Sequence, residues 1–82
     1  MTHIYHSRDI YYLEYSDLNG MHAIELDITN STIDEAIDNE LRKINNPNNP
    51  IDYAALYKNE ILRDTFGAEY YREDPILVKE II

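Results

Sequence analysis

The chain has no cysteine and only two glycines among its 82 residues. Without cysteine it can form neither a disulfide bond nor a thiolate metal site. Gly20 and Gly67 each lie where the sequence predicts a turn or a helix stop, so no glycine-rich loop remains to bind phosphate groups. These absences exclude disulfide-stabilised folds and the common nucleotide-binding motifs.

Positive charge and long apolar runs are also scarce. Seven lysines and arginines stand against sixteen aspartates and glutamates, which gives a net charge of −9. Nucleic acids and acidic membranes are bound through Lys and Arg, so we expect no direct contact with either. No apolar run approaches the length of a membrane span, and residues 1–6 lack the basic and apolar regions of a signal peptide. Together with the lack of cysteine, this predicts a cytoplasmic protein.

The residues that are present predict one small folded domain. A hydrophobic content of 44% argues against disorder. A chain of this length is expected to form a single compact domain over residues 1–82. Such a domain buries a thin core, so its stability is limited.

The clearest structural signal is a β-hairpin over residues 10–28. Alternating apolar and polar residues flank Asn19-Gly20, a pair that favours a type I′ turn. With these two residues at the centre of the turn, Leu13 lies opposite Leu26 on an apolar face. Burial of that face is expected to hold the register, because a one-residue slip would turn it to solvent.

The other face of the predicted hairpin is acidic. The same register places Glu14 directly opposite Glu25, and like charges across a strand pair repel. Tyr12, Asp17 and Asp27 extend this region. One interpretation is a solvated surface that tolerates the repulsion, and the other is a site for a cation or a basic partner.

Helical signals follow the hairpin. Ser31 or Thr32 caps a helix over residues 33–44, which has acids in its first turn and bases in its last. Residues 50–66 have apolar side chains at helical spacing after a proline and before a glycine, which predicts a second helix. Residues 75–82 fit a third, short helix, with a closing strand as the alternative.

These elements predict an α+β fold, in which an N-terminal antiparallel β-hairpin packs against two or three α-helices (ββαα(α)). Residues 2–9 form either a short leading strand or an extension of the first hairpin strand. The residues that we expect to be most buried are Leu13, Leu26, Ile37, Leu41 and Leu62.

The sequence offers little material for catalysis or metal binding. His3 and His6 have a spacing that suits a metal only on a helix or a turn, and no helix is predicted there. The serines have no evident His–Asp partnership, and a chain this small hardly encloses a substrate cleft as well as a core. We therefore expect no enzyme activity, no cofactor and no metal site.

Tyrosine and carboxylate side chains are the chemistry that remains. Tyrosine provides large, rigid contact area at interfaces, and spaced carboxylates attract Arg and Lys on a partner much as phosphates do along a nucleic acid. The candidate partner-binding residues are Tyr12, Glu14, Asp17, Glu25, Asp27, Asp34, Glu35 and Asp38.

In this composition the chain resembles the small acidic inhibitors of bacteriophages, the DNA-mimic and anti-CRISPR proteins that block a nucleic-acid-binding surface. The resemblance implies an inhibitor in the host cytoplasm that occupies the basic groove of a nucleic-acid-binding protein or nuclease complex. The alternative is a small structural or regulatory subunit that docks or forms a homodimer through the apolar residues of 76–82, with incidental acidity. Salt separates the two, because groove binding weakens as salt rises and apolar assembly does not.

Overall fold

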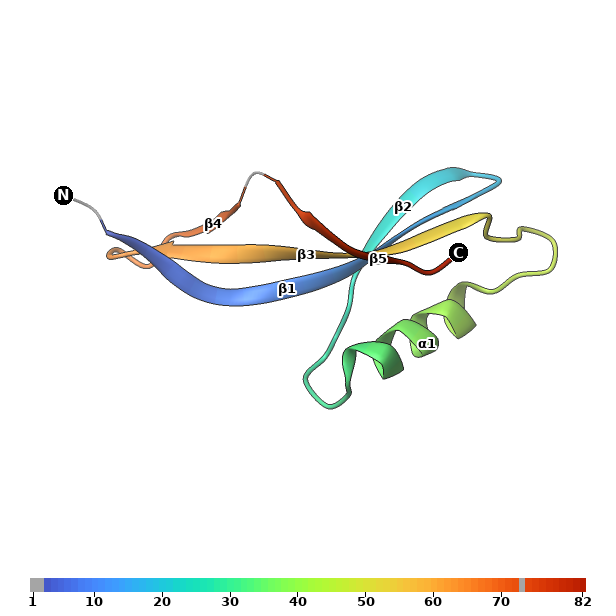
Figure 1. The fold of residues 1–82 in the computed structure, drawn as a ribbon, viewed down its shortest axis with the longest axis horizontal. Coiled ribbons are helices and arrows are strands. Elements are labelled where there is room, and N and C mark those ends of the chain that lie inside the picture. Colours follow the sequence, from blue (N-terminus) through green and yellow to red (C-terminus); the bar gives the residue numbers. More distant parts are fainter. Residues whose placement is uncertain (1–2, 73) are drawn as a thin grey trace.

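The computed structural model describes residues 3–72 and 74–82, and it consists mainly of antiparallel β-strands (Figure 1). Within these residues it contains one helix, so the prediction of an α+β fold with two or three helices is wrong. The elements in chain order are β1 (Ile4–Asp17), β2 (Gly20–Glu25), α1 (Ile33–Ile44), β3 (Tyr53–Asp64), β4 (Glu69–Tyr71) and β5 (Ile76–Glu80).

The strands form one curled sheet around the long pair β1 and β3. These two strands pair antiparallel over almost their whole length, and β2 pairs with the C-terminal half of β1. On the far edge of β3, β5 pairs with residues 55–58 and β4 pairs with residues 61–63. The strand order is therefore β2-β1-β3-β4, with β5 beside β3.

The molecule is elongated and has two parts, which Figure 1 shows side by side. We name the part of the sheet that lies against α1 the covered half. The buried residues of the core between this part and α1 are Leu13, Leu26, Ala36, Ile37, Ala54 and Leu56. The extension has no helix over it and comprises residues 4–9 of β1, residues 59–64 of β3 and β4. The two long strands run through both parts.

The segment predicted as a second helix, residues 50–66, contains β3 instead. Its Ala, Leu, Lys and Glu residues favour a helix locally, but pairing on both edges overrides that preference. Ala54, Ala55 and Leu56 are all buried, because a strand in the middle of a sheet can be covered on both faces. Such a continuous apolar run hides the alternation that marks a strand.

The tail was predicted as a short helix, and this is also wrong, because residues 76–80 form β5. The closing strand, which the sequence offered as the alternative for this tail, is the structure that residues 76–80 adopt. At the other end, β1 continues from Asp17 back to Ile4, so the leading residues extend the first hairpin strand. The helix over residues 33–44 is confirmed with the same bounds.

The hairpin is present, but its register differs from the prediction by two residues. Leu13 lies opposite Ile24, and Glu14 lies opposite Ala23 rather than Glu25. In the described residues only glycines have positive φ, and Gly20 has φ 110°. A type I′ turn needs two residues with positive φ, but this turn has only Gly20, which closes it. A shift of two keeps each side chain on its predicted face.

The predicted core is partly correct. Leu13, Leu26 and Ile37 are buried, as expected. Leu41 and Leu62 are only half-buried, so their place among the most buried residues is wrong. Leu41 packs at the margin of the core, and Leu62 lies in the extension, where no helix covers the sheet.

Candidate binding face

Side chains of the sheet alternate between the face under α1 and an opposite, uncovered face. Leu13 and Leu56 lie opposite each other and belong to the core under α1, so their neighbours along β1 and β3 point the other way. Glu25 and Glu80 lie opposite such neighbours on the outer strands. We name the resulting surface the tyrosine–glutamate face; it comprises Tyr12, Glu14, Glu25, Tyr53, Tyr57 and Glu80.

Three tyrosines form the centre of this face. The rings of Tyr12 and Tyr57 are stacked, with centroids 5.6 Å apart and planes inclined by 11°. The hydroxyl oxygens of Tyr53 and Tyr57 lie 3.4 Å apart and share a hydrogen bond. Between these two tyrosines, Ala55 is completely buried even though it faces away from α1. The small alanine thus lies between two half-buried tyrosines and is itself fully buried.

Neighbouring groups raise the pKa of two of these phenols, those of Tyr53 and Tyr12. The hydrogen bond to Tyr57, partial burial and the charges of Glu14 and Glu80 raise the pKa of Tyr53 to about 12. The pKa of Tyr12 is raised by burial first, then by Glu14 and Tyr57. A neutral phenol with a raised pKa is a poor nucleophile or base at neutral pH, so the arrangement suits binding rather than proton transfer.

The glutamates of this face have no ion-pair partner among residues 3–72 and 74–82. No Lys, Arg or His lies within salt-bridge distance of Glu14, Glu25 or Glu80, although six of the seven Lys and Arg side chains form ion pairs elsewhere. These six are Arg8 and Arg63 with Glu69, Arg72 with Glu60, Lys58 with Asp9, Lys43 with Glu40, and Lys79 with Asp34. The negative charge of the face is therefore not offset locally.

A shallow open depression of about 490 Å³ lies on the same side of the sheet. Its lining includes Tyr12 and Glu14 from β1, Glu25 from β2 and Tyr71 from β4. Curvature of the sheet thus brings acidic and aromatic groups from both ends of the strand order to one surface. The depression is too open to shield a small substrate from water, but it can receive side chains of another protein.

Three of the eight predicted site residues lie together on this face, namely Tyr12, Glu14 and Glu25. Asp17 has a structural role in the turn: its carboxylate accepts a hydrogen bond from the Asn19 amide and bonds His22 and Asn49. The hydrogen bond to His22 is the main cause that lowers the pKa of Asp17. This carboxylate is engaged within the turn and is not free for a partner.

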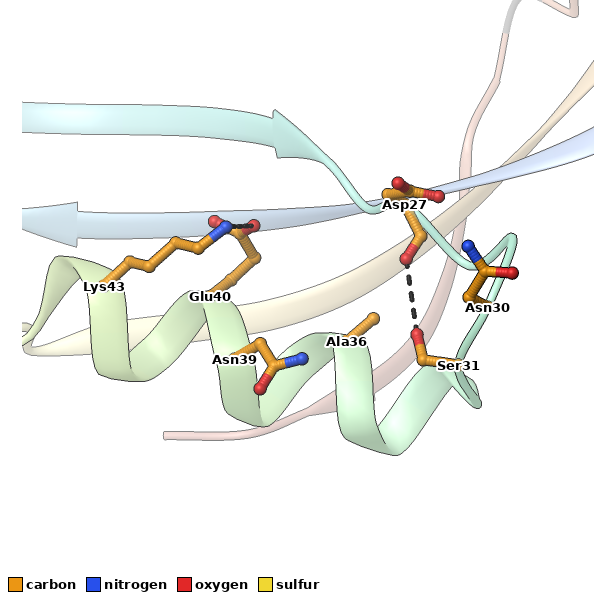
Figure 2. A pocket seen from close by; sticks show the side chains of 7 residues that line it. All are labelled: Asp27, Asn30, Ser31, Ala36, Asn39, Glu40 and Lys43. Carbon is orange, nitrogen blue, oxygen red and sulfur yellow. Dashed lines mark hydrogen bonds and ion pairs between the residues drawn. The ribbon is translucent and has the colours of Figure 1, made fainter.

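Asp27 lies in the loop before α1, beside a polar cavity of about 290 Å³ (Figure 2). Its carboxylate accepts from the Thr29 amide at 3.0 Å, and the bonds to Thr29, helped by Lys43, lower its pKa. Its carbonyl oxygen accepts from the Ser31 hydroxyl at 3.4 Å, and Lys43 pairs with Glu40 at 3.3 Å. The two bonds of Asp27 fix the loop itself, and the ion pair lies within α1; the loop bonds explain Asp27 without a ligand.

Asp34, Glu35 and Asp38 lie on the exposed surface of α1. The helix covers the opposite side of the sheet, so these acids do not share a surface with Glu14 and Glu25. Asp34 also forms an ion pair with Lys79 at 3.1 Å. The structure therefore divides the predicted site among the uncovered face, the loops and the helix.

Sequence reasoning missed half of the tyrosine–glutamate face. Tyr53 and Tyr57 lie in the segment that the sequence predicts as a second helix, and Glu80 lies in the tail that it predicts as a third. A signal for the strand was present, because Tyr53, Ala55 and Tyr57 alternate with Ala54 and Leu56 at a period of two. Only the pairing of β3 with β1 shows that these tyrosines join Tyr12.

No protein family, no curated protein and no solved structure matches this chain. Within the part of the chain that the structure describes, no helix is long and apolar enough to cross a membrane. The same residues contain no group of three or more His, Asp or Glu side chains placed to hold a metal ion. The functional assignment below therefore depends on the geometry of the face.

Proposed function

We propose that the protein binds a cationic surface of a partner protein through the tyrosine–glutamate face. The observation that carries this proposal is the contrast in ion pairing among the residues that the structure describes: six of the seven Lys and Arg side chains are paired elsewhere, while Glu14, Glu25 and Glu80 are not paired. Unpaired carboxylates beside half-buried aromatic rings suit the guanidinium group of arginine. That group bonds a carboxylate through two N–H groups and stacks on an aromatic ring.

The partner that this chemistry fits best is a protein with a basic groove for nucleic acid. Such grooves present Arg and Lys at the spacing of phosphates, and a net charge of −9 steers the two proteins together. Occupation of the groove excludes the nucleic acid, so the protein acts as a competitive inhibitor of nucleic-acid binding. It needs no catalytic group for this role. A cytoplasmic location stays a prediction.

The predicted direct opposition of Glu14 and Glu25 is wrong, because Glu14 lies opposite Ala23 and Glu25 lies opposite Tyr12. The face is now supported by the unpaired glutamates and by the stacked tyrosines. These features also predict that tyrosine matters as much as charge. A test must therefore change the two kinds of side chain separately.

The test compares two double variants of equal net charge. Glu14→Gln with Glu25→Gln, and Glu35→Gln with Asp38→Asn, each change the net charge from −9 to −7. Binding to an arginine-rich peptide is measured by calorimetry at low and high salt. We expect the first variant to bind about 2- to 30-fold more weakly and to depend less on salt, since each exposed pair contributes about 0.2–1 kcal/mol. The helix variant should bind nearly as wild type does.

Equal losses in the two variants would show that only net charge matters and would refute the face as the site. Tyr57→Leu keeps the apolar bulk and removes the stacking partner of Tyr12. Its affinity should fall although no charge changes. For a partner captured through the face, the wild-type protein should also displace duplex DNA in a competition assay, and the Glu14/Glu25 variant should fail to do so.

A second candidate function is self-association or docking through the tail, because β5 exposes apolar side chains. Ile76, Leu77 and Val78 are 60%, 48% and 47% exposed. Sedimentation at rising salt separates the candidates: apolar assembly through β5 persists or strengthens, whereas cationic binding weakens. Ile76→Asp should abolish the former and leave the latter, because Ile76 lies opposite Lys58 and so points away from the tyrosine–glutamate face.

A further inference from the structure

The outer edge of β2 is an open end of the sheet. Among the strands of residues 3–72 and 74–82, β2 has β1 on one side and no strand on the other. The Leu26 amide donates to the Tyr11 carbonyl at 2.8 Å, so this opposed pair is hydrogen-bonded. Bonded pairs alternate along an antiparallel ladder, so in β2 the N–H and C=O groups of Met21, Ala23 and Glu25 point outward.

The open edges of β1 and β5 carry features that oppose pairing, and β2 lacks most of these features. The free edge of β1, residues 4–10, contains a β-bulge between His6 and Arg8 and the charges of Arg8 and Asp9. The edge strand β5 follows Pro75, carries Lys79 and has an irregular register with β3. Bulges, prolines and lysines all protect strand edges. β2 pairs with β1 in regular register and contains neither proline nor lysine.

The side chains of the three outward-bonding residues lie on the tyrosine–glutamate face. Met21 lies opposite Ser16, Ala23 lies opposite Glu14 and Glu25 lies opposite Tyr12. A strand added antiparallel to β2 would place its own bonding residues on that same face, because directly opposed residues share a face. Every second residue of the added strand would then both form backbone hydrogen bonds to β2 and place its side chain on the tyrosine–glutamate face.

We propose that β2 receives an extended cationic segment of the partner, which joins the sheet as an antiparallel neighbour. This inference rests on the proposed function, because the charge of the face selects the segment. An arginine opposite Ala23 extends over a single methyl group toward Glu14, two strand spacings or about 10 Å away. An arginine opposite Glu25 meets that carboxylate directly.

The intervening residues of the segment would be apolar. They lie on the α1 side of the sheet, beside the half-buried His22 and Ile24 of β2, and Ile24 packs against the core. The segment therefore alternates arginine with a β-branched residue. A second copy of this chain is a poor occupant, since each copy carries a net charge of −9 and the β2 side chains on the tyrosine–glutamate face include Glu25.

The experiment uses the whole protein and a peptide of alternating Arg and Val as the probe. Two control peptides have the same sequence but carry backbone N-methyl groups, either on the arginines or on the valines. In antiparallel addition the arginine N–H groups bond β2, so N-methyl-arginine should weaken binding at least about tenfold. N-methyl-valine should bind as the unmodified peptide does. Amide exchange at Met21, Ala23 and Glu25 should slow when the unmodified peptide is added.

Other results would overturn the inference in distinct ways. Equal binding of all three peptides, still weakened by Glu14→Gln with Glu25→Gln, would refute strand addition and leave the proposed function standing. Selective loss with N-methyl-valine would refute the antiparallel arrangement. No binding by any of the peptides would refute recognition of this segment. Slowed exchange at β2 in concentrated protein without peptide would show that a second copy takes the edge.

Discussion

The covered half and the extension contain parts of the same two strands, yet different forces stabilise them. Under α1, Leu13, Leu26 and Leu56 are buried in an apolar core. In the extension the buried residues are the apolar Ile61 and the charged Asp64. There, Glu69 pairs with Arg8 and Arg63, and Glu60 pairs with His6 and Arg72.

This difference shows how a long sheet can be stable although the one helix among the described residues covers only part of it. Apolar burial contributes most in the part of the sheet that another layer covers. Beyond the helix, hydrogen bonds and ion pairs across the strands hold the ribbon together, and such exposed pairs contribute little each. The extension should therefore open more easily than the covered half, and it should respond to pH and salt.

The largest expected effect is in the core of the covered half. Leu13 is completely buried, so Leu13→Ala should lower the free energy of unfolding by about 2–5 kcal/mol. Leu41→Ala, at the half-buried margin, should cost less. Urea denaturation followed by circular dichroism measures both. A cost for Leu41→Ala equal to or above that for Leu13→Ala would contradict the placement of the core.

Acid should open the extension before the covered half. Hydrogen bonds from His6, and then Arg72, lower the pKa of Glu60, and Arg63 and Arg8 lower that of Glu69. A carboxylate with a lowered folded pKa contributes stability that is present above its unfolded pKa and is lost as the pH falls through the folded value. Below about pH 4, amide signals of β4 should therefore broaden or shift first in NMR spectra. Simultaneous loss of α1 signals would contradict a separate opening.

The turn between β3 and β4 should depend on one carboxylate. Asp64 accepts hydrogen bonds from the amides of Phe66 and Ala68 and from the Tyr70 hydroxyl, and the bond to Tyr70 is the main cause of its lowered pKa. Asp64→Ala should accelerate amide exchange at residues 66–68 and leave α1 unchanged. Thr65→Ala, one residue along the same turn, is the matched control and should change little.

The smallest effect is expected at an exposed apolar side chain of the extension. Ile4 is 60% exposed and starts β1, so Ile4→Ser should change the free energy of unfolding by about 0.5 kcal/mol or less. Thermal unfolding of the variant beside wild type measures this. A loss near 2 kcal/mol would mean that the end of the extension is covered in solution, for example by another copy.

The sequence predicted which residues of the candidate site lie on the same side of the hairpin, but not where the other candidate residues lie relative to them. Alternation in the hairpin put Tyr12, Glu14 and Glu25 on one side of the sheet, and the two-residue error in register did not move them to the other side. Asp34, Glu35 and Asp38 of α1 are exposed, as candidate binding residues must be. These acids lie on the opposite side of the sheet from Glu14 and Glu25 because α1 covers that side. Non-local packing decides which side the helix covers.

The sequence by itself determined α1 and the position of the hairpin, since both depend on local signals. Thr32 caps the helix by accepting from the Glu35 amide at 3.2 Å, with acids in the first turn and bases in the last. Only the tertiary structure decided that residues 53–64 form a strand. Its partners, β1 and β5, lie at distant points of the chain, and their hydrogen bonds outweigh a local preference for helix that amounts to tenths of a kcal/mol per residue. The same pairing places Tyr57 on Tyr12 and so creates the face.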